Sequence, residues 1–155
     1  MLYVGVPVGL ASNARTSTYV RFVEEAPDAG VRAQFTAGAH VYRVAPSEGC
    51  GCEFNAEGVN PTTYEEIETL TELWTHAGED DRKLIVRACH LRGELREWIE
   101  THHLQMRVEL YYCWMEEEGI PHSRFETLVL AQMTVPTALF KTGVHYTVLE
   151  LPAQK

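Results

Sequence analysis

Positive charge is scarce in this sequence. Its 155 residues include 13 Lys and Arg against 22 Asp and Glu, which gives a formal net charge of −9 at pH 7. Proteins that bind DNA or RNA need clustered lysines and arginines to contact the phosphates. The composition therefore argues against nucleic-acid binding and predicts a well-solvated acidic protein.

Long apolar runs are missing as well. No uninterrupted apolar segment approaches the roughly 20 residues of a transmembrane helix. The start of the chain, Met1 to Pro7, lacks the basic residues and the extended apolar segment of a signal peptide. We therefore expect no membrane association and a cytoplasmic location. Internal repeats are absent too, and the length predicts one domain over residues 1–155.

The common catalytic motifs are also absent. The sequence contains no phosphate-binding glycine loop, no serine nucleophile elbow and no zinc-protease helix motif. Its acidic clusters fall in predicted turns or at a helix start, where solvation and the helix dipole explain them. The sequence therefore leaves open which residues are catalytic and whether the chain is an enzyme.

Cysteine is scarce, but two of the four cysteines lie in one turn, Gly49-Cys50-Gly51-Cys52. Because glycine tolerates backbone conformations that other residues avoid, this turn can bend tightly and point both sulfurs the same way. Such a pair suits zinc or another soft metal ion, or reversible thiol chemistry. The alternative is a purely structural turn with two small, partly buried sulfurs.

A metal site in this turn needs further ligands, because zinc takes four, or three with an open position. The secondary candidates are Cys89 beside the apolar stripe of a predicted helix, Cys113 on a mixed strand face, and His40 on the strand before the turn. None of them has the paired C-x-x-C spacing that makes a zinc prediction strong. Cys50 and Cys52 are therefore the predicted site.

Two helices are predicted in the middle of the chain. The first starts at Thr62 or Thr63 and stops at Gly78. The second opens at Glu79, and its apolar residues recur at steps of three and four. These residues form one stripe: Leu84, Ala88, Leu91, Leu95, Trp98 and His102. The short connection at Gly78 predicts an antiparallel hairpin.

Strands are predicted on both sides of the helices. They cover residues 3–10, 18–23, 40–44, 106–115, 125–135 and 145–151. Pro7 places the first strand at a sheet edge or at a bend. Short connections between the last three strands favour antiparallel pairing. The predicted fold class is α+β, an antiparallel β-sheet with the α-helical hairpin packed on one face.

One face of the predicted strand 106–115 is mixed in character. The alternation places Val108, Leu110 and Tyr112 on an apolar face. The opposite face carries Arg107, Glu109, Tyr111 and Cys113. If that face of the sheet is open, its side chains can line a surface for a small ligand.

The segment 40–54 resembles a signature of small uncharacterised bacterial proteins. In that family a strand of the type H-V-Y leads into a G-C-G-C-x-F turn. Here the strand is His40-Val41-Tyr42, and the turn runs from Gly49 to Phe54. The resemblance implies a bacterial source and carries no catalytic role, because no activity is established for the family.

Two hypotheses for the function follow. In the first, the Gly-Cys-Gly-Cys turn is the functional site, through a soft metal ion or through thiol chemistry. In the second, the chain is a non-enzymatic acidic interaction module that binds a basic protein partner, and the turn is structural. The cysteine pair favours the first hypothesis.

Overall fold

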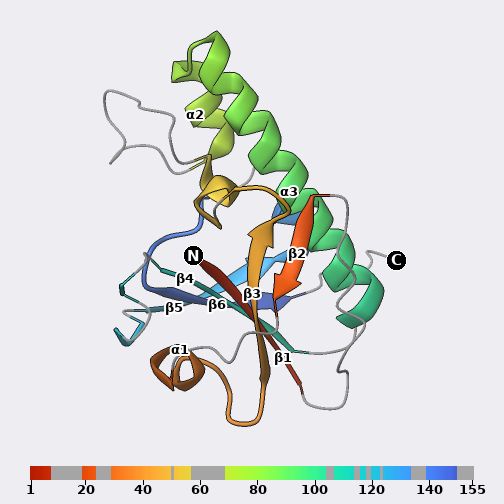
Figure 1. The fold of residues 1–155 in the computed structure, drawn as a ribbon, viewed down its shortest axis with the longest axis vertical. Coiled ribbons are helices and arrows are strands. Elements are labelled where there is room, and N and C mark those ends of the chain that lie inside the picture. Colours follow the sequence, from red (N-terminus) through yellow and green to blue (C-terminus); the bar gives the residue numbers. More distant parts are fainter. Residues whose placement is uncertain are drawn as a thin grey trace.

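One mixed six-stranded sheet forms the centre of the molecule, with helices on both of its sides (Figure 1). The computed structural model describes residues 1–7, 19–23, 29–49, 51–56, 69–103, 107–113, 116–117, 120–122, 124–133 and 139–149. The strands are β1 (Leu2–Val6), β2 (Val20–Val23), β3 (His40–Pro46), β4 (Val108–Tyr112), β5 (Arg124–Val129) and β6 (Val144–Leu149). The helices are α1 (Ala29–Ala33), α2 (Leu70–His76) and α3 (Glu79–His103), with 3-10 turns η1 (Gly51–Asn55) and η3 (Leu130–Met133). The α+β class is confirmed.

The sheet differs from the predicted one because it is not purely antiparallel. Its strand order is β2-β3-β1-β4-β6-β5, and β5 pairs with β6 in parallel. Parallel neighbours need a connection of a dozen or more residues to return the chain to the same end. Residues 130–143 supply that length and include η3. The apolar run predicted as one strand to residue 135 in fact leaves the sheet after Val129.

The first strand is central, which contradicts the edge position expected from Pro7. β1 pairs with β3 on one side and with β4 on the other, and all five of its residues are buried. The strand ends at Val6, so Pro7 follows the hydrogen-bonded ladder and does not interrupt it.

The second half of the apolar stripe of α3 packs on one face of the sheet, whereas Leu84 and Ala88 of the first half lie in a separate cluster. Leu91, Leu95 and Trp98 join a buried cluster with residues of the central strands, including Tyr42 and Leu110. In Figure 1 the second half of α3 runs along this face, whereas its first half extends beyond the sheet. The core therefore lies between α3 and the alternate residues of β1, β3, β4 and β6.

The first helix of the predicted hairpin differs in its start and in its packing. α2 begins at Leu70, where Thr69 is the N-cap and forms a capping box with Glu72. The predicted start at Thr62 or Thr63 lies outside the described residues. The buried residues of α2 join a separate cluster with the first half of α3, and none of that cluster lies in a strand. Of the two described helices of the predicted hairpin, α3 packs on the sheet and α2 does not join its core cluster. Among the described helices, none is both long enough and apolar enough to cross a bilayer.

The opposite face of the sheet carries α1 and the connection from α1 to β3. Phe35 in this connection lies directly over Gly5 of β1, where an added Cβ would be 2.4 Å from the Phe35 ring. Phe35, Val31 of α1 and Tyr111 of β4 are buried in a small cluster on this face. Because Phe35 needs the space that Gly5 leaves, the glycine sets how closely the connection approaches the sheet.

Candidate functional site

The predicted cysteine turn lies where β3 ends and η1 begins. Cys52 is half-buried in η1, and it is disulfide-bonded. Cys89 and Cys113 carry free thiols. Cys50, the fourth cysteine of the chain, lies outside the described residues. A sulfur that is bonded in a disulfide is not a thiolate, which is the form of cysteine that binds a metal ion.

Two glycines allow the turn to pack closely on its surroundings. Gly49 has a φ of 106°, and an added Cβ would lie 1.7 Å from Oε1 of Glu53. At Gly51 an added Cβ would lie 3.3 Å from the backbone nitrogen of Leu2 and 3.4 Å from the carbonyl oxygen of Val44. The turn is therefore fitted against the start of β1 and the end of β3.

We expect Gly49→Ala to lower the free energy of unfolding by about 1–3 kcal/mol, since the new side chain needs a left-handed backbone and displaces the Glu53 carboxylate. Urea denaturation measures the change. Gly78→Ala is the control, because the nearest atom to its added Cβ is 3.9 Å away. That control should shift stability by less than about 1 kcal/mol. Equal effects at the two positions would contradict the account of Gly49.

Arg87 of α3 holds the outer side of the turn. Its guanidinium forms an ion pair with Glu53 and also donates a hydrogen bond to the carbonyl oxygen of Glu48. The Arg87 side chain is partly exposed, so solvent weakens this ion pair. The contact nevertheless fixes the direction in which the turn leaves β3.

Arg92 of α3 holds the inner side of the turn and is completely buried. Its Nε donates to the carbonyl oxygen of Phe54 at 2.6 Å, and its Nη2 donates to Oδ1 of Asn55 at 2.7 Å. The guanidinium also lies 4.2 Å from the centroid of the Phe140 ring. Burial lowers the pKa of Arg92 to about 10, so the group still carries its charge at neutral pH. A buried cation is thus directed at the segment that follows Cys52.

The structure does not bring the secondary metal-ligand candidates together. His40 is the first residue of β3, whereas η1 follows its last residue, so about 20 Å of strand separates them at ~3.3 Å per residue. Cys113 is buried in the small cluster on the α1 side of the sheet. Among the described residues, no group of three or more His, Cys, Asp or Glu side chains is placed to hold a metal ion.

Cys89 packs against residues that adjoin the segment after the turn. It contacts the cluster of α2 and α3 that includes Ala56, the residue directly after η1. Burial raises the pKa of the Cys89 thiol, and the nearby charge of Arg92 only partly offsets this effect. The Cys89 thiol therefore stays protonated at neutral pH and is a weak nucleophile.

A second polar arrangement lies on the mixed face of β4, which the sequence pattern indicated. Glu109 is buried there and accepts hydrogen bonds from the backbone nitrogen of Thr36 at 2.9 Å and from its hydroxyl at 2.6 Å. Nε of Arg107 lies 2.8 Å from Oε1 of Glu109. Burial alone raises the pKa of the carboxyl, but interactions with His145 and Thr36 outweigh it and lower the pKa from 4.5 to about 2. Glu109 is therefore ionised and closely held.

His145 lies next to this carboxylate, and His122 lies next to His145. Nε2 of buried His145 lies 3.8 Å from Oε2 of Glu109, beyond hydrogen-bond distance, so their interaction is electrostatic. The His145 and His122 rings are 5.4 Å apart, and Nδ1 of His122 donates to Oε1 of Gln34 at 2.7 Å. Burial, and next the proximity of His145, lower the pKa of His122. The sequence did not indicate that these histidines meet, since they are far apart in the chain.

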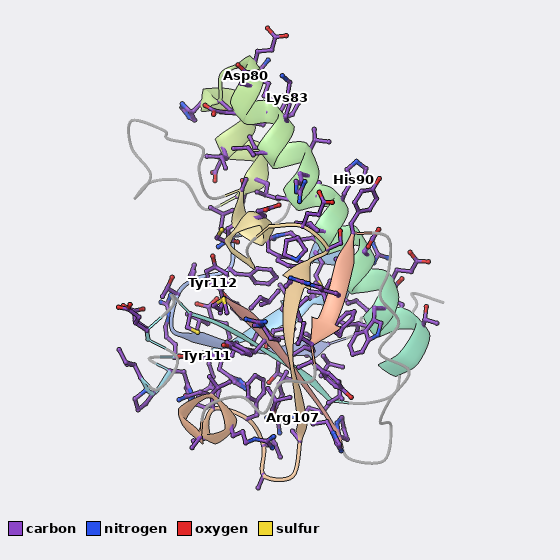
Figure 2. The ribbon with its side chains drawn as sticks, in the orientation of Figure 1. Asp80, Lys83, His90, Arg107, Tyr111 and Tyr112 are labelled. Carbon is purple, nitrogen blue, oxygen red and sulfur yellow. The ribbon has the colours of Figure 1, made fainter. Side chains whose placement is uncertain are left out.

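Tyr111 and Cys113, which the sequence placed on the same mixed face, are buried and do not form an open surface. Figure 2 shows Tyr111 and Tyr112 extending to opposite sides of β4, Tyr112 toward the α3 side and Tyr111 toward the α1 side. The predicted ligand surface is thus reduced to the end of β4 that carries Arg107 and Glu109.

Comparisons of the chain with known protein families, with curated proteins and with solved structures find no match. Any account of its function therefore rests on its own residues.

Proposed function

We propose that this chain is a thiol–disulfide protein whose functional site is the Cys50-Gly51-Cys52 turn. The observation that carries the proposal is the disulfide at Cys52, on a half-buried residue that solvent can reach. Since Cys89 and Cys113 are free thiols, we take Cys50 as the partner of Cys52. In a cytoplasmic protein a disulfide is usually transient, with a catalytic or redox-sensing role.

The chemistry requires a dithiol as the second reactant. One thiolate of that dithiol attacks a sulfur of the protein disulfide, forms a mixed disulfide and releases the other protein sulfur as a thiolate. The second thiolate of the dithiol then breaks the mixed disulfide. Two electrons pass to the protein, which ends with two cysteine thiols, while the dithiol becomes a disulfide. The reverse steps oxidise the protein at the expense of a small-molecule or protein disulfide.

The surroundings of the turn support this reaction. Positive charge next to a cysteine favours its thiolate form. Arg92 directs its buried cation to the carbonyl of Phe54, two residues after Cys52. The absence of a side chain at Gly51 lets the turn lie close to backbone atoms of β1 and β3, where an added Cβ would be 3.3 Å from the Leu2 nitrogen.

Counting thiols in the unfolded chain before and after reduction tests the proposal. We expect two free thiols, from Cys89 and Cys113, in protein purified without reductant and four after dithiothreitol treatment. Equilibration with mixtures of reduced and oxidised dithiothreitol should give one reversible two-electron transition. Mass spectrometry of peptides should place the disulfide between Cys50 and Cys52.

Cysteine variants separate the turn from the other thiols. Cys52→Ser should abolish the redox transition, whereas Cys89→Ser should keep it and only lower the thiol count by one. Four free thiols in the oxidised protein, or a transition that survives Cys52→Ser, would contradict the proposal. Stoichiometric zinc that is lost in Cys52→Ser would favour the metal-binding form of the site instead. The acidic interaction module and the bacterial family resemblance stay predictions.

A further inference from the structure

A cavity of about 240 Å³ lies at the end of β1, beside the connection from α1 to β3. Its apolar wall includes Val6, Pro7 and Ala37, and its polar wall is made by Thr36, Arg107 and Glu109. Figure 2 shows Arg107 at this end of the sheet. The cysteine turn contacts the other end of β1, at Leu2. The cavity is therefore a separate feature from the proposed thiol site.

Glu109 in the cavity wall is already fully engaged. Its side chain is only 3% exposed, and both of its oxygens accept hydrogen bonds from Thr36. Oε1 also contacts Nε of Arg107 at 2.8 Å. A buried carboxylate with this many donors is rigid, and it serves to orient the arginine.

The two terminal amino groups of the Arg107 guanidinium are available to a ligand. The Arg107 side chain is 58% exposed, and Glu109 engages only Nε. Within the described part of the chain, the two terminal amino groups have no other partner. These two groups lie in one plane and match the two oxygens of a carboxylate. Because Glu109 already fixes the guanidinium, a ligand loses less entropy in ordering it.

We propose that this cavity binds a small aliphatic carboxylate, with its carboxylate on the free edge of Arg107 and its chain along Val6, Pro7 and Ala37. A cavity of about 240 Å³ is smaller than the roughly 300–1,000 Å³ of a pocket for a drug-sized ligand, so it suits a short chain such as hexanoate. This ligand site goes beyond the proposed thiol chemistry and does not depend on it.

A series of straight-chain carboxylates tests the proposal. Acetate, butyrate, hexanoate and octanoate are titrated into the intact protein, and NMR chemical-shift changes give the dissociation constants. Affinity should rise about fourfold for each buried methylene group and stop rising near hexanoate, where the cavity is full. The matched alcohol, 1-hexanol, should bind at least tenfold more weakly than hexanoate, because it lacks the charged partner for Arg107.

Variants identify the groups responsible. Arg107→Gln should bring hexanoate binding down to the level of 1-hexanol. Arg124→Gln is the matched control, because Arg124 is 55% exposed and pairs with Glu126, two residues along a strand, but lies outside the cavity wall. Ala37→Leu fills the cavity from an exposed position and should abolish binding of both compounds while the protein stays folded.

Three results would overturn the proposal. They are affinity that is independent of chain length, hexanoate binding that survives Arg107→Gln, and inorganic phosphate binding more tightly than any carboxylate. The last result would identify a simple anion site. Loss of the redox transition in Cys52→Ser should leave hexanoate binding unchanged, so failure of either proposal is distinguishable from failure of the other.

Discussion

Replacing Arg92 with alanine should lower the free energy of unfolding by about 3–5 kcal/mol. The change removes a completely buried side chain and leaves a cavity between α3 and η1. It also leaves the carbonyl of Phe54 without the donor that it now has at 2.6 Å. Oδ1 of Asn55 loses its 2.7 Å hydrogen bond from Arg92 and keeps the one from the Phe140 nitrogen. Buried acceptors without a partner are costly, because water no longer solvates them.

Urea denaturation with an unchanged m-value would measure this loss. Arg96→Ala is the control on the same helix, since Arg96 is partly exposed and pairs with Glu100 at 2.7 Å. A surface pair of this kind contributes less than about 1 kcal/mol. Arg92→Lys should fall between the two, because an ammonium keeps the charge but cannot direct two donors as the guanidinium does. Similar losses for Arg92→Ala and Arg96→Ala would show that the buried hydrogen bonds contribute little.

The expected loss matters for function because Arg92 joins the cysteine turn to the core. Asn55 accepts a hydrogen bond from Arg92 and is also hydrogen-bonded to Phe140. Its Nδ2 donates to the Phe140 carbonyl, and the Phe140 nitrogen donates to its Oδ1. This link connects η1, α3 and the segment before β6. If the thiol site is functional, Arg92→Ala should therefore alter its redox transition as well as the global stability.

Local patterns in the sequence were sufficient to predict the helix α3 and most of the strands. The stripe of α3 depends only on a spacing of three and four residues, and the structure buries Ala88, Leu91, Leu95 and Trp98 as that spacing requires. The alternation in β4 likewise separated Leu110 from Glu109 correctly. Such patterns show which side of a helix or strand packs on the core, because the spacing of apolar residues within that element determines its buried face.

Pairing between distant segments was not predictable in the same way. The parallel contact of β5 with β6 depends on the course of residues 130–143, which no short-range pattern specifies. The central place of β1 depends on two partners that lie far along the chain, β3 and β4. Pro7 suggested an edge because proline cannot donate a ladder hydrogen bond, but the strand ends one residue before it.

The candidate site was found in part, and the missing part has a recognisable signal. The scarcity of cysteine led to the turn, but Arg92 was not predicted to be buried. Its position fits the helical spacing, because Ile85, Ala88, Arg92, Leu95 and Ile99 are three or four residues apart and all are buried. An arginine at a core position of a helix indicates a buried polar partner. Here the partners are the carbonyl oxygen of Phe54 and the side chain of Asn55 in η1. These partners could not be identified from sequence, because they lie on a separate segment.

Acid should destabilise the protein through Glu109. The pKa of Glu109 is lowered from 4.5 to about 2 in the folded protein. The folded state therefore takes up this proton less readily than the unfolded state, so the ionised group contributes stability above pH 4.5. That contribution is lost as the pH falls toward 2. The shift corresponds to about 3 kcal/mol at neutral pH, because one pKa unit corresponds to ~1.4 kcal/mol.

Glu109→Gln isolates this contribution, because the amide keeps the shape of the side chain but does not ionise. We expect the variant to be less stable than the unmodified protein by about 3 kcal/mol at pH 7, and the difference to disappear between pH 4.5 and pH 2. The groups that face Glu109 are Thr36, Arg107 and His145. The same measurements on His145→Gln and on the double variant separate the contribution of His145 to stability from that of Glu109.

The matched control for this titration is Glu126→Gln on β5. Glu126 also pairs with an arginine two residues before it, at 3.1 Å from Arg124, but its side chain is 32% exposed. Solvent screens such a pair, so the control should change stability by less than about 1 kcal/mol at pH 7. A gap between the unmodified protein and Glu109→Gln that stays constant from pH 7 to pH 2.5 would mean that the glutamine fails through its shape and not through its charge. The ionised, hydrogen-bonded carboxylate would then have no special role in holding Thr36 and Arg107 at the cavity.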